Sequence, residues 1–375
     1  MSTFARTDRS VISQWWWTVD RLTLLALLLI AGIGIVLTMA ASPSVAQRIG
    51  LDPFYFARRQ AVYLPLAICV VLLTSLLSPK GVRRTATFGF LIAYALTAAT
   101  LFLGPEVKGA TRWLAFGSVS LQPSEFLKPS LVVVCAWLIA ASRNTGTFVG
   151  YGLAGLLLVA SVGVLALQPD IGTTLLICAA WGVQIFLAGC PLVLIAMLGF
   201  VFAGGAVGAY FLFEHVRHRV DNFLDPSTGS DGYQIGRALE AFASGGLFGR
   251  GPGEGRVKEV LPDAHADFIF AVAGEEFGLI VCVIVVGLFM LVLMQGFLRA
   301  LKDNDLFVVL SVGALLTLFG AQALMNMAST VHLIPPKGTT LPFISYGGSA
   351  SLALAWTMGM VLALTRERPE WETWK

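Results

Sequence analysis

The feature of this sequence that most limits its fold is a series of long apolar segments that recur along almost the whole chain. A helix of about 20 apolar residues matches the thickness of a bilayer's hydrocarbon core. Of the 375 residues, 57% are hydrophobic and only 13% are charged, whereas about a quarter of a typical soluble domain is charged. The sequence therefore predicts an all-α, polytopic integral membrane protein and excludes a water-soluble globular one.

Ten segments are long and apolar enough to cross the membrane. They lie at Leu22–Ala41, Ala61–Leu77, Thr85–Leu103, Pro123–Ala141, Phe148–Leu167, Ile171–Ala188, Pro191–Phe213, Phe268–Leu298, Leu306–Ala328 and Ser345–Leu364. The short polar breaks between them predict one membrane domain over residues 1–375, with an N-terminal tail at 1–21, one large loop at 214–266 and a C-terminal tail at 365–375.

The basic residues predict how this domain is oriented. Ten spans place both termini on one side, and the side with more Lys and Arg in short loops is normally cytoplasmic. The termini's side has Arg6, Arg9, Arg21, Lys80, Arg83, Arg84, Arg143, Arg299, Lys302, Arg366, Arg368 and Lys375. The other side has fewer, namely Arg48, Arg58, Arg59, Lys108, Arg112 and Lys337. We therefore expect cytoplasmic termini and a periplasmic 214–266 loop.

Charge and cysteine content exclude several kinds of function. A net charge of +3 supports neither a nucleic-acid groove nor a polybasic lipid anchor. The five cysteines are odd in number, lie in or beside apolar runs and form no CxxC pair. No disulfide framework or cysteine metal site is therefore expected, and the cysteines are interpreted as small apolar residues.

Ionisable residues near the spans are the strongest indication of a functional site, because each is costly inside a bilayer. Four charged residues lie inside the predicted spans, namely Glu125, Lys128, Glu275 and Glu276. Asp170 and Asp267 lie where spans begin. All six fall in the outer half of the predicted membrane domain, so the site is expected to open toward the periplasm.

Glu125 and Lys128 are three residues apart and share one helix face. They form either an internal salt bridge or part of a binding site in which Lys128, with nearby Arg112, receives the phosphate of a lipid. Asp170, in a tight outer turn, either caps the helix that follows or orients a substrate cation, a metal or Lys128. Both alternatives stay open from the sequence.

The last outer loop is rich in proline and glycine, which predicts a fixed re-entrant loop whose backbone is satisfied by protein or by a water-filled cavity. Lys337 in this loop is a second candidate for phosphate, and Ser345 is a candidate substrate contact. The neighbouring His332 is interpreted as a polar loop residue. The glycine-dense segment at 244–255 lacks a phosphate-binding fingerprint; it is either a mobile cover for substrate or a flexible connector.

Asp267 is the most plausible catalytic carboxylate, because a general base needs a partly water-excluded position beside the reacting group. The alternative is a helix cap. Glu275 and Glu276 lie roughly 12 Å deeper at 1.5 Å per residue, so buried pairing or helix packing is expected for them in place of catalysis.

These blocks together resemble the SEDS family of cell-wall polymerases, from the first span to the last. Residues 341–349, Leu-Pro-Phe-Ile-Ser-Tyr-Gly-Gly-Ser, and residues 273–276, Ala-Gly-Glu-Glu, are more similar to its division branch than to its elongation branch. Ala266 departs from the threonine that the family often has there, which affects local hydrogen bonding only.

The resemblance implies ten helices and an enzyme at the division septum that polymerises lipid II, the undecaprenyl-pyrophosphate-linked disaccharide pentapeptide. It implies that Asp267 matches the family's essential loop aspartate. On chemical grounds Asp267 would deprotonate or orient the acceptor GlcNAc 4-hydroxyl, which attacks the donor MurNAc and inverts its anomeric carbon. Arg112, Lys128 and Lys337 would stabilise the departing pyrophosphate.

The resemblance also implies partners: a class B penicillin-binding protein and other membrane proteins of the division machinery. No cofactor is certain; a divalent cation, Mg²⁺ or Mn²⁺, bridging the pyrophosphate is the weaker alternative. Two rival functions are a lipid II flippase and a noncatalytic division scaffold. Transporters often have repeated halves and polar groups near the midplane, whereas here the charges lie on one side and the halves look unrelated.

Overall fold

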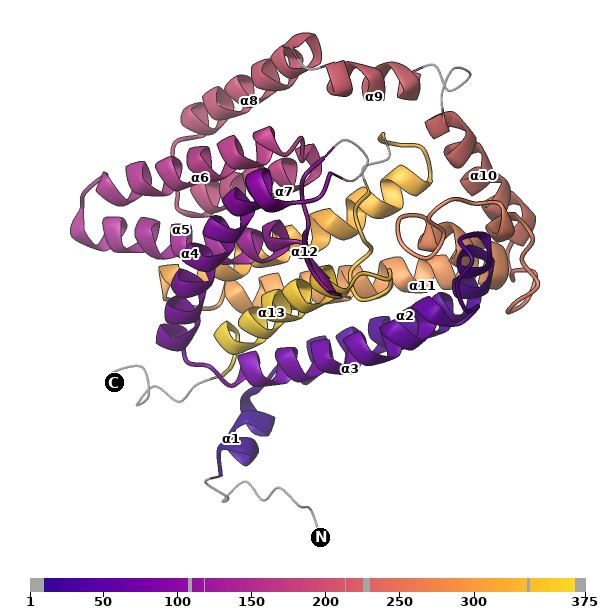
Figure 1. Ribbon diagram of the computed structural model, residues 1–375. Coiled ribbons are helices and arrows are strands. Elements are labelled where there is room, and N and C mark those ends of the chain that lie inside the picture. The colour runs from indigo at the N-terminus through magenta and orange to yellow at the C-terminus, as the bar shows by residue number, and fades with distance from the viewer. Residues whose placement is uncertain are drawn as a thin grey trace.

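The computed structural model describes residues 10–106, 110–117, 119–212, 214–224, 230–335 and 338–367. Most of these residues are helical (Figure 1). The helices are α1 Val11–Thr18, α2 Arg21–Arg48, α3 Tyr55–Ser75, α4 Pro79–Leu103, α5 Pro123–Thr145, α6 Val149–Leu167, α7 Ile171–Leu187, α8 Leu192–Leu212, α9 Glu214–Leu224, α10 Ser230–Gly245, α11 Ile269–Ala300, α12 Leu306–Thr330 and α13 Gly348–Leu364. Two short antiparallel strands, β1 Leu114–Phe116 and β2 Val119–Leu121, form a hairpin before α5.

Helices occupy all ten segments that the sequence predicts to cross the membrane. Within the described residues, seven of them (α2, α3, α4, α5, α6, α11 and α12) are long and apolar enough to span a bilayer, and three shorter apolar stretches are α7, α13 and Leu192–Gly205 of α8. The predicted all-α, multi-pass fold is therefore confirmed. The last helix begins at Gly348 and not at Ser345, because residues 345–347 still belong to the buried loop before it.

The centre of the bundle is formed by α5 and α12, the spans with the largest buried share of residues. They pack against each other, and α4, α6, α7, α11 and α13 surround them. By contrast, α8 is apolar on every side and lies at the edge of the bundle, with side chains such as Phe200 exposed (Figure 1). A helix that is apolar all round has no preferred inner face, which suits contact with lipid on most sides.

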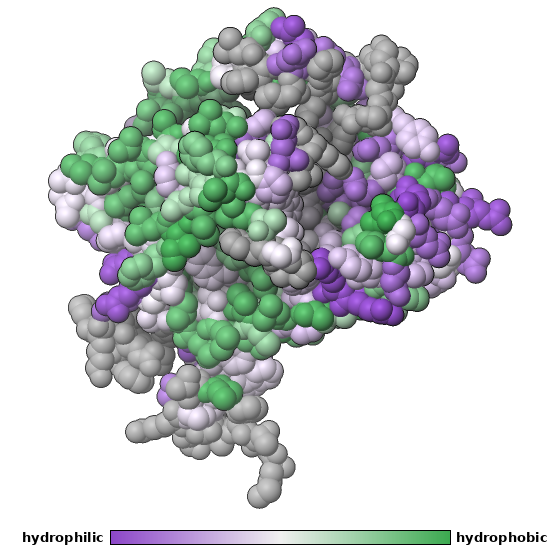
Figure 2. Space-filling model, in the orientation of Figure 1, coloured by the Kyte–Doolittle hydropathy of each residue, from purple (hydrophilic) through white to green (hydrophobic). Residues whose placement is uncertain are grey.

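The first and last described parts of the chain meet at one end of the bundle. The Glu367 amide donates to the Thr18 carbonyl at 3.1 Å. Arg299, in the last turn of α11, forms ion pairs with Asp20 at 3.0 Å and with Glu367 at 3.4 Å. The opposite end, which we call the active-site end, has α10 and the turn between α2 and α3. Hydrophilic residues gather there, whereas apolar residues cover the flank of α4, α6 and α8 (Figure 2).

The glycine-dense segment after α10 is packed against α11. The amides of Arg250 and Gly251 donate to the carbonyls of Glu275 and Glu276 at 2.9 and 3.0 Å. These carbonyls are available because α11 is broken at Gly278, whose φ is 77° and ψ −176°. None of residues 244–255 lines the active-site cavity described below. The segment is therefore a docked part of the bundle, and the expectation of a mobile cover for substrate does not fit this packing.

Glu275 and Glu276 hold this docked segment in place. The Glu275 carboxylate accepts hydrogen bonds from the amides of Arg256, Val257 and Lys258 at 2.7, 2.7 and 2.9 Å. Glu276 forms a buried ion pair with the Lys258 ammonium. The predicted buried pairing of these two carboxylates is thus confirmed, and it explains how they are tolerated inside a span.

Candidate active site

A cavity of about 700 Å³ lies at the active-site end, between α3, α5, α7, α12 and the loops around them. It is lined by five of the residues that the sequence selected: Arg112, Glu125, Lys128, Asp170 and Asp267. Ser345 is buried next to the cavity but does not line it. Lys337 lies outside the described residues. The structure therefore brings together charged groups that are up to 155 positions apart in the sequence, from Arg112 to Asp267.

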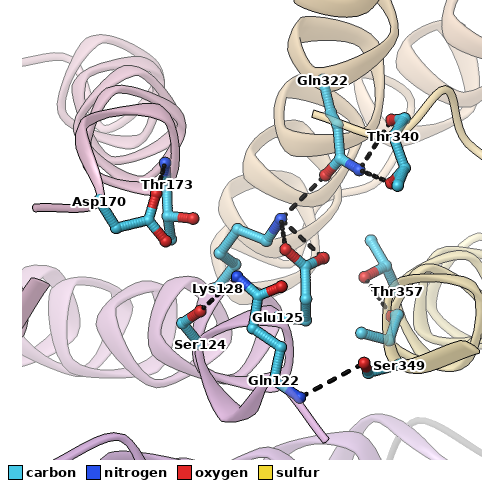
Figure 3. A network of polar contacts seen from close by, with 11 residues as sticks. Gln122, Ser124, Glu125, Lys128, Asp170, Thr173, Gln322, Thr340, Ser349 and Thr357 are labelled. Carbon is cyan, nitrogen blue, oxygen red and sulfur yellow. Dashed lines mark hydrogen bonds and ion pairs between the residues drawn. The ribbon is translucent and has the colours of Figure 1, made fainter. Parts of the chain in front are cut away.

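Lys128 is fixed on the cavity wall by a network of polar contacts (Figure 3). Pro123 begins α5, which places Glu125 and Lys128 in its first two turns. The Lys128 ammonium donates to both Glu125 carboxylate oxygens at 3.0 and 2.9 Å and to the Gln322 amide oxygen at 2.9 Å. The Gln322 amide nitrogen in turn donates to Thr340. The salt-bridge alternative is confirmed, and a role of Lys128 in binding phosphate stays a prediction.

Asp170 caps α7, as the first alternative predicted: its Oδ1 accepts from the Thr173 amide at 3.2 Å. Arg112 reaches the same turn, with its Nη1 3.9 Å from Asp170 Oδ1 and its Nε donating to the Gln168 carbonyl at 3.1 Å. Asp170 Oδ2 is buried and has no hydrogen-bond partner among the described residues. Because Asp170 lines the cavity, this oxygen is available to a ligand or to water.

Asp267 is half-buried on the cavity wall, in the loop that leads into α11. Its backbone is held from two sides. The Asn326 side-chain amide, on α12, donates to the Asp267 carbonyl at 2.9 Å and to the Thr339 carbonyl at 2.6 Å. The Ser345 hydroxyl donates to the Ala266 carbonyl at 2.6 Å and accepts from the Leu341 amide at 2.7 Å.

These contacts tie the Asp267 segment to the loop before α13. That loop is fixed inside the protein, with Leu341, Phe343 and Ile344 almost fully buried, as the density of proline and glycine predicted. Ser345 thus lies behind Asp267 and steadies its backbone, although a direct contact of Ser345 with substrate stays a prediction. A carboxylate on a backbone fixed this firmly is preoriented for proton transfer.

Sequence reasoning did not select Arg59 and Tyr346, which also line the cavity. Arg59 is on α3 and its side chain hydrogen-bonds that of Tyr346, in the loop before α13. Burial raises the pKa of the Tyr346 hydroxyl and the Arg59 charge opposes this shift, so the phenol stays protonated at neutral pH. From the sequence, Arg59 is only one of several charges in an outer loop. In the structure α3 begins at Tyr55, one turn earlier, so Arg59 belongs to the first turns of this helix.

His265 lies two residues before Asp267 but does not line the cavity. Its ring stacks on Phe56 with centroids 4.0 Å apart. Burial lowers the pKa of His265 to about 4; nearby Asp263 opposes this shift and Arg48 adds to it. The imidazole is therefore neutral at neutral pH, and the only carboxylates on the cavity wall among the described residues are Glu125, Asp170, Asp263 and Asp267.

Comparison with known proteins identifies the family. Residues 20–370 match the cell cycle protein family FtsW/RodA/SpoVE. The chain belongs to this family. The SEDS resemblance seen in the sequence is thus confirmed, because this match covers nearly the whole chain.

Relatives in other bacteria match over similar lengths. The probable peptidoglycan glycosyltransferase FtsW of Caulobacter vibrioides is 48% identical over 98% of this chain and 94% of its own. The probable peptidoglycan glycosyltransferase FtsW of Trichlorobacter lovleyi is 32% identical over 92% of this chain and 93% of its own. These relatives support the predicted enzyme class, peptidoglycan glycosyltransferase, and the division branch of the family.

Two solved structures share the fold. One, described as a peptidoglycan synthase complex that coordinates polymerization and crosslinking, has a chain that superposes with a TM-score of 0.78 at 28% identity, covering 93% of this chain and 98% of that one. The other, the rod shape determining protein RodA of Thermus thermophilus, gives a TM-score of 0.69 at 27% identity, covering 93% and 97%.

Proposed function

We propose that this protein polymerises lipid II into glycan strands during cell division, with Asp267 as the catalytic base. The observation that carries the proposal is the composition of one cavity wall. A half-buried carboxylate on a fixed backbone shares the cavity with three cationic side chains, Arg59, Arg112 and Lys128. Glycosyl transfer from a lipid pyrophosphate needs both kinds of group, a base for the acceptor and positive charge for the leaving group.

In the proposed reaction, Asp267 takes the proton of the acceptor GlcNAc 4-hydroxyl as that oxygen bonds to the donor MurNAc anomeric carbon. The bond from this carbon to the pyrophosphate oxygen breaks on the opposite face, and undecaprenyl pyrophosphate leaves with the electron pair. The anomeric centre is inverted because attack and departure occur on opposite faces. The half-buried Tyr346 hydroxyl, which stays protonated, is a further donor near Arg59.

The three cations differ in how well they suit the pyrophosphate. Lys128 is bound to Glu125 and Gln322, so its charge is largely neutralised. Arg112 is bound to backbone carbonyls and lies 3.9 Å from Asp170. Arg59 hydrogen-bonds the Tyr346 phenol and lines the same cavity wall. We therefore add Arg59 to the predicted phosphate-binding residues Arg112, Lys128 and Lys337.

A divalent cation, Mg²⁺ or Mn²⁺, stays the weaker alternative for neutralising the pyrophosphate. The described residues contain no cluster of three or more His, Cys, Asp or Glu side chains that could hold a metal ion. A cation would therefore take most of its ligands from the pyrophosphate, with Asp170 Oδ2 as the protein oxygen best placed to complete them.

The proposal includes location and partners. The protein lies in the bacterial inner membrane at the division septum, with both termini cytoplasmic and the active-site end periplasmic. This orientation is supported by basic residues at the end of the bundle where Thr18 and Glu367 lie. Among them are Arg21, Arg299 and Arg366. We propose a class B penicillin-binding protein and other division proteins as partners; the similar complex described as coordinating polymerization and crosslinking supports this.

A flippase is the second candidate, since an apolar groove for a lipid tail serves either task. The cavity carrying the charged groups is at one end of the bundle, whereas a carrier is expected to have its polar site near the midplane. A scaffold would not require a fixed carboxylate opposite cations. Both features favour the polymerase.

Reconstitution with lipid II tests the proposal. The purified protein, with a class B penicillin-binding protein present, should convert lipid II into glycan ladders on a gel. Asp267→Asn keeps the volume but removes the base, so product formation should fall roughly 100-fold or more. Asp52→Asn is the matched control, because Asp52 is an exposed carboxylate paired with Arg58 away from the cavity. Full polymerisation by Asp267→Asn, or none by the wild type, would refute the proposal.

A further inference from the structure

A second cavity, of about 910 Å³, lies on the outside of the bundle at the active-site end. It follows the second half of α2 and is bounded by Phe277 of α11 and by the docked segment after α10. We call it the α2 groove. It shares no lining residue with the candidate active site, so nothing in the proposed reaction accounts for it.

The polarity of the α2 groove changes along its length. Val36 and Met39, at its deep end, are apolar and 49% and 51% exposed. Gln47 and Arg48, at its other end, form the last turn of α2. The twelve steps from Val36 to Arg48 correspond to about 18 Å of helix, close to the roughly 15 Å hydrocarbon depth of one leaflet. The groove therefore has the length and polarity of a lipid in one leaflet.

The polar end of the groove has groups of both signs. Arg48 and Glu259 are exposed there, whereas Lys258 is buried and paired with Glu276. Arg48 uses Nε and Nη2 to bind the carbonyls of Ser44 and Leu261, at 3.3 and 2.7 Å. Among the described residues, none forms a hydrogen bond with its Nη1. A phosphate oxygen can therefore bind there. One exposed cation beside one exposed carboxylate is complementary to a zwitterion and not to a pyrophosphate.

Pro252, Gly253 and Glu259 also line the groove. The exposed charges of Arg48 and Glu259 favour a phospholipid headgroup over a partner's transmembrane helix, because charged groups are costly beside the apolar surface of such a helix.

We propose that the α2 groove binds one zwitterionic phospholipid, such as phosphatidylethanolamine, from the leaflet at the active-site end. Its phosphate binds Arg48, its ammonium binds Glu259, and an acyl chain lies along α2 to Val36. Arg48 also binds the Leu261 carbonyl, six residues before Asp267. The bound lipid thus steadies the chain segment that leads to the catalytic carboxylate.

Lipid retention by the full-length protein tests this site. Protein purified in detergent is mixed with equal amounts of phosphatidylethanolamine and phosphatidylglycerol, and bound lipids are counted by native mass spectrometry. We expect one retained phosphatidylethanolamine. Val36→Trp should fill the groove and abolish retention. Ile35→Trp is the matched control, because Ile35 is the neighbouring exposed residue of α2 and does not line the groove.

Two headgroup variants test the charges. Glu259→Gln should shift the preference from phosphatidylethanolamine toward phosphatidylglycerol, and Arg48→Gln should weaken retention of both. Arg58→Gln, an exposed arginine outside the groove, should change neither.

Equal retention by Val36→Trp and Ile35→Trp would overturn the proposal, as would equal binding of the two lipids by the wild type. So would a Val36→Trp variant that keeps its lipid but loses binding of the penicillin-binding protein, since this would assign the groove to a helix. The measurement involves no turnover, so its outcome is independent of whether the protein polymerises lipid II.

Discussion

At the scale of single residues, most ionisable groups in and beside the spans are satisfied by specific partners. Lys128 is bound to Glu125, and Lys258 to Glu276. Asp267 lines the cavity, and Asn326 and Ser345 fix its backbone and that of Ala266. The ion pairs of Lys128 and Lys258 thus stabilise the bundle, whereas the backbone contacts around Asp267 hold this residue at the cavity wall.

Lys128→Met tests how much of the Lys128 contribution is structural. The Glu125 carboxylate would be left buried without its cation, which typically costs about 3 to 5 kcal/mol. We expect a clear fall in melting temperature, and a partial recovery in the Glu125→Gln/Lys128→Met double variant. Arg237→Met is the matched control: its pair with Glu240 has the same spacing but is exposed, so it should cost less than about 1 kcal/mol.

The polymerisation assay on the double variant then separates the two roles of Lys128. If Lys128 also binds pyrophosphate, the recovered fold stays inactive. A stable double variant with normal polymerisation would remove Lys128 from the substrate site.

His265 makes stability depend on pH. Its folded-state pKa of about 4 lies below the ordinary 6.5 because the ring is buried. As pH falls below 6.5, the unfolded chain binds a proton that the folded chain does not, so stability is lost between about pH 6.5 and 4, by about 3 kcal/mol at most. Melting temperature against pH should fall less steeply for His265→Asn in this window. His332→Asn is the control; an unchanged slope in His265→Asn would contradict the assignment.

At the scale of elements, the break in α11 positions the loop that ends at Asp267. The amides of Leu279 and Ile280 donate to the carbonyls of Gly246 and Leu247 at 3.0 and 3.3 Å instead of continuing the helical pattern. The docked segment therefore takes the place of one helical turn. Glu275 then binds the amides of residues 256–258, which fixes the chain a few residues before the loop that ends at Asp267.

Gly278→Ala tests this arrangement. A Cβ at residue 278 would lie 2.4 Å from the Gly249 nitrogen and the Leu247 oxygen, and the φ of +77° disfavours any side chain. We expect a loss of about 1 to 3 kcal/mol from backbone strain alone, with faster tryptic cleavage at Arg250 and Arg256. In Gly287→Ala, on the same helix with open space around it, stability should stay the same or rise slightly. Equal behaviour of the two variants would show that the docking is not required.

At the scale of the whole molecule, the sequence predicted the helices well because bilayer thickness fixes the length of an apolar span. It also identified Glu125, Lys128, Asp170 and Asp267 as neighbours at one end, since charges in spans are few. It did not place Arg59 beside Tyr346, or the segment after α10 against α11. Those contacts join residues far apart in the chain, and no local pattern encodes them. The salt bridge of Lys128 and the helix cap of Asp170 could be recognised only once their partners in space were known, and their roles toward a substrate stay predictions.

The most direct test of the whole account is a structure of the Asp267→Asn variant, with its partner, bound to lipid II in a membrane. The account predicts the acceptor 4-hydroxyl within about 3 Å of the residue 267 side chain, and the pyrophosphate against Arg59, Arg112 and Lys128. A pyrophosphate bound elsewhere, with residue 267 turned away from both sugars, would contradict it.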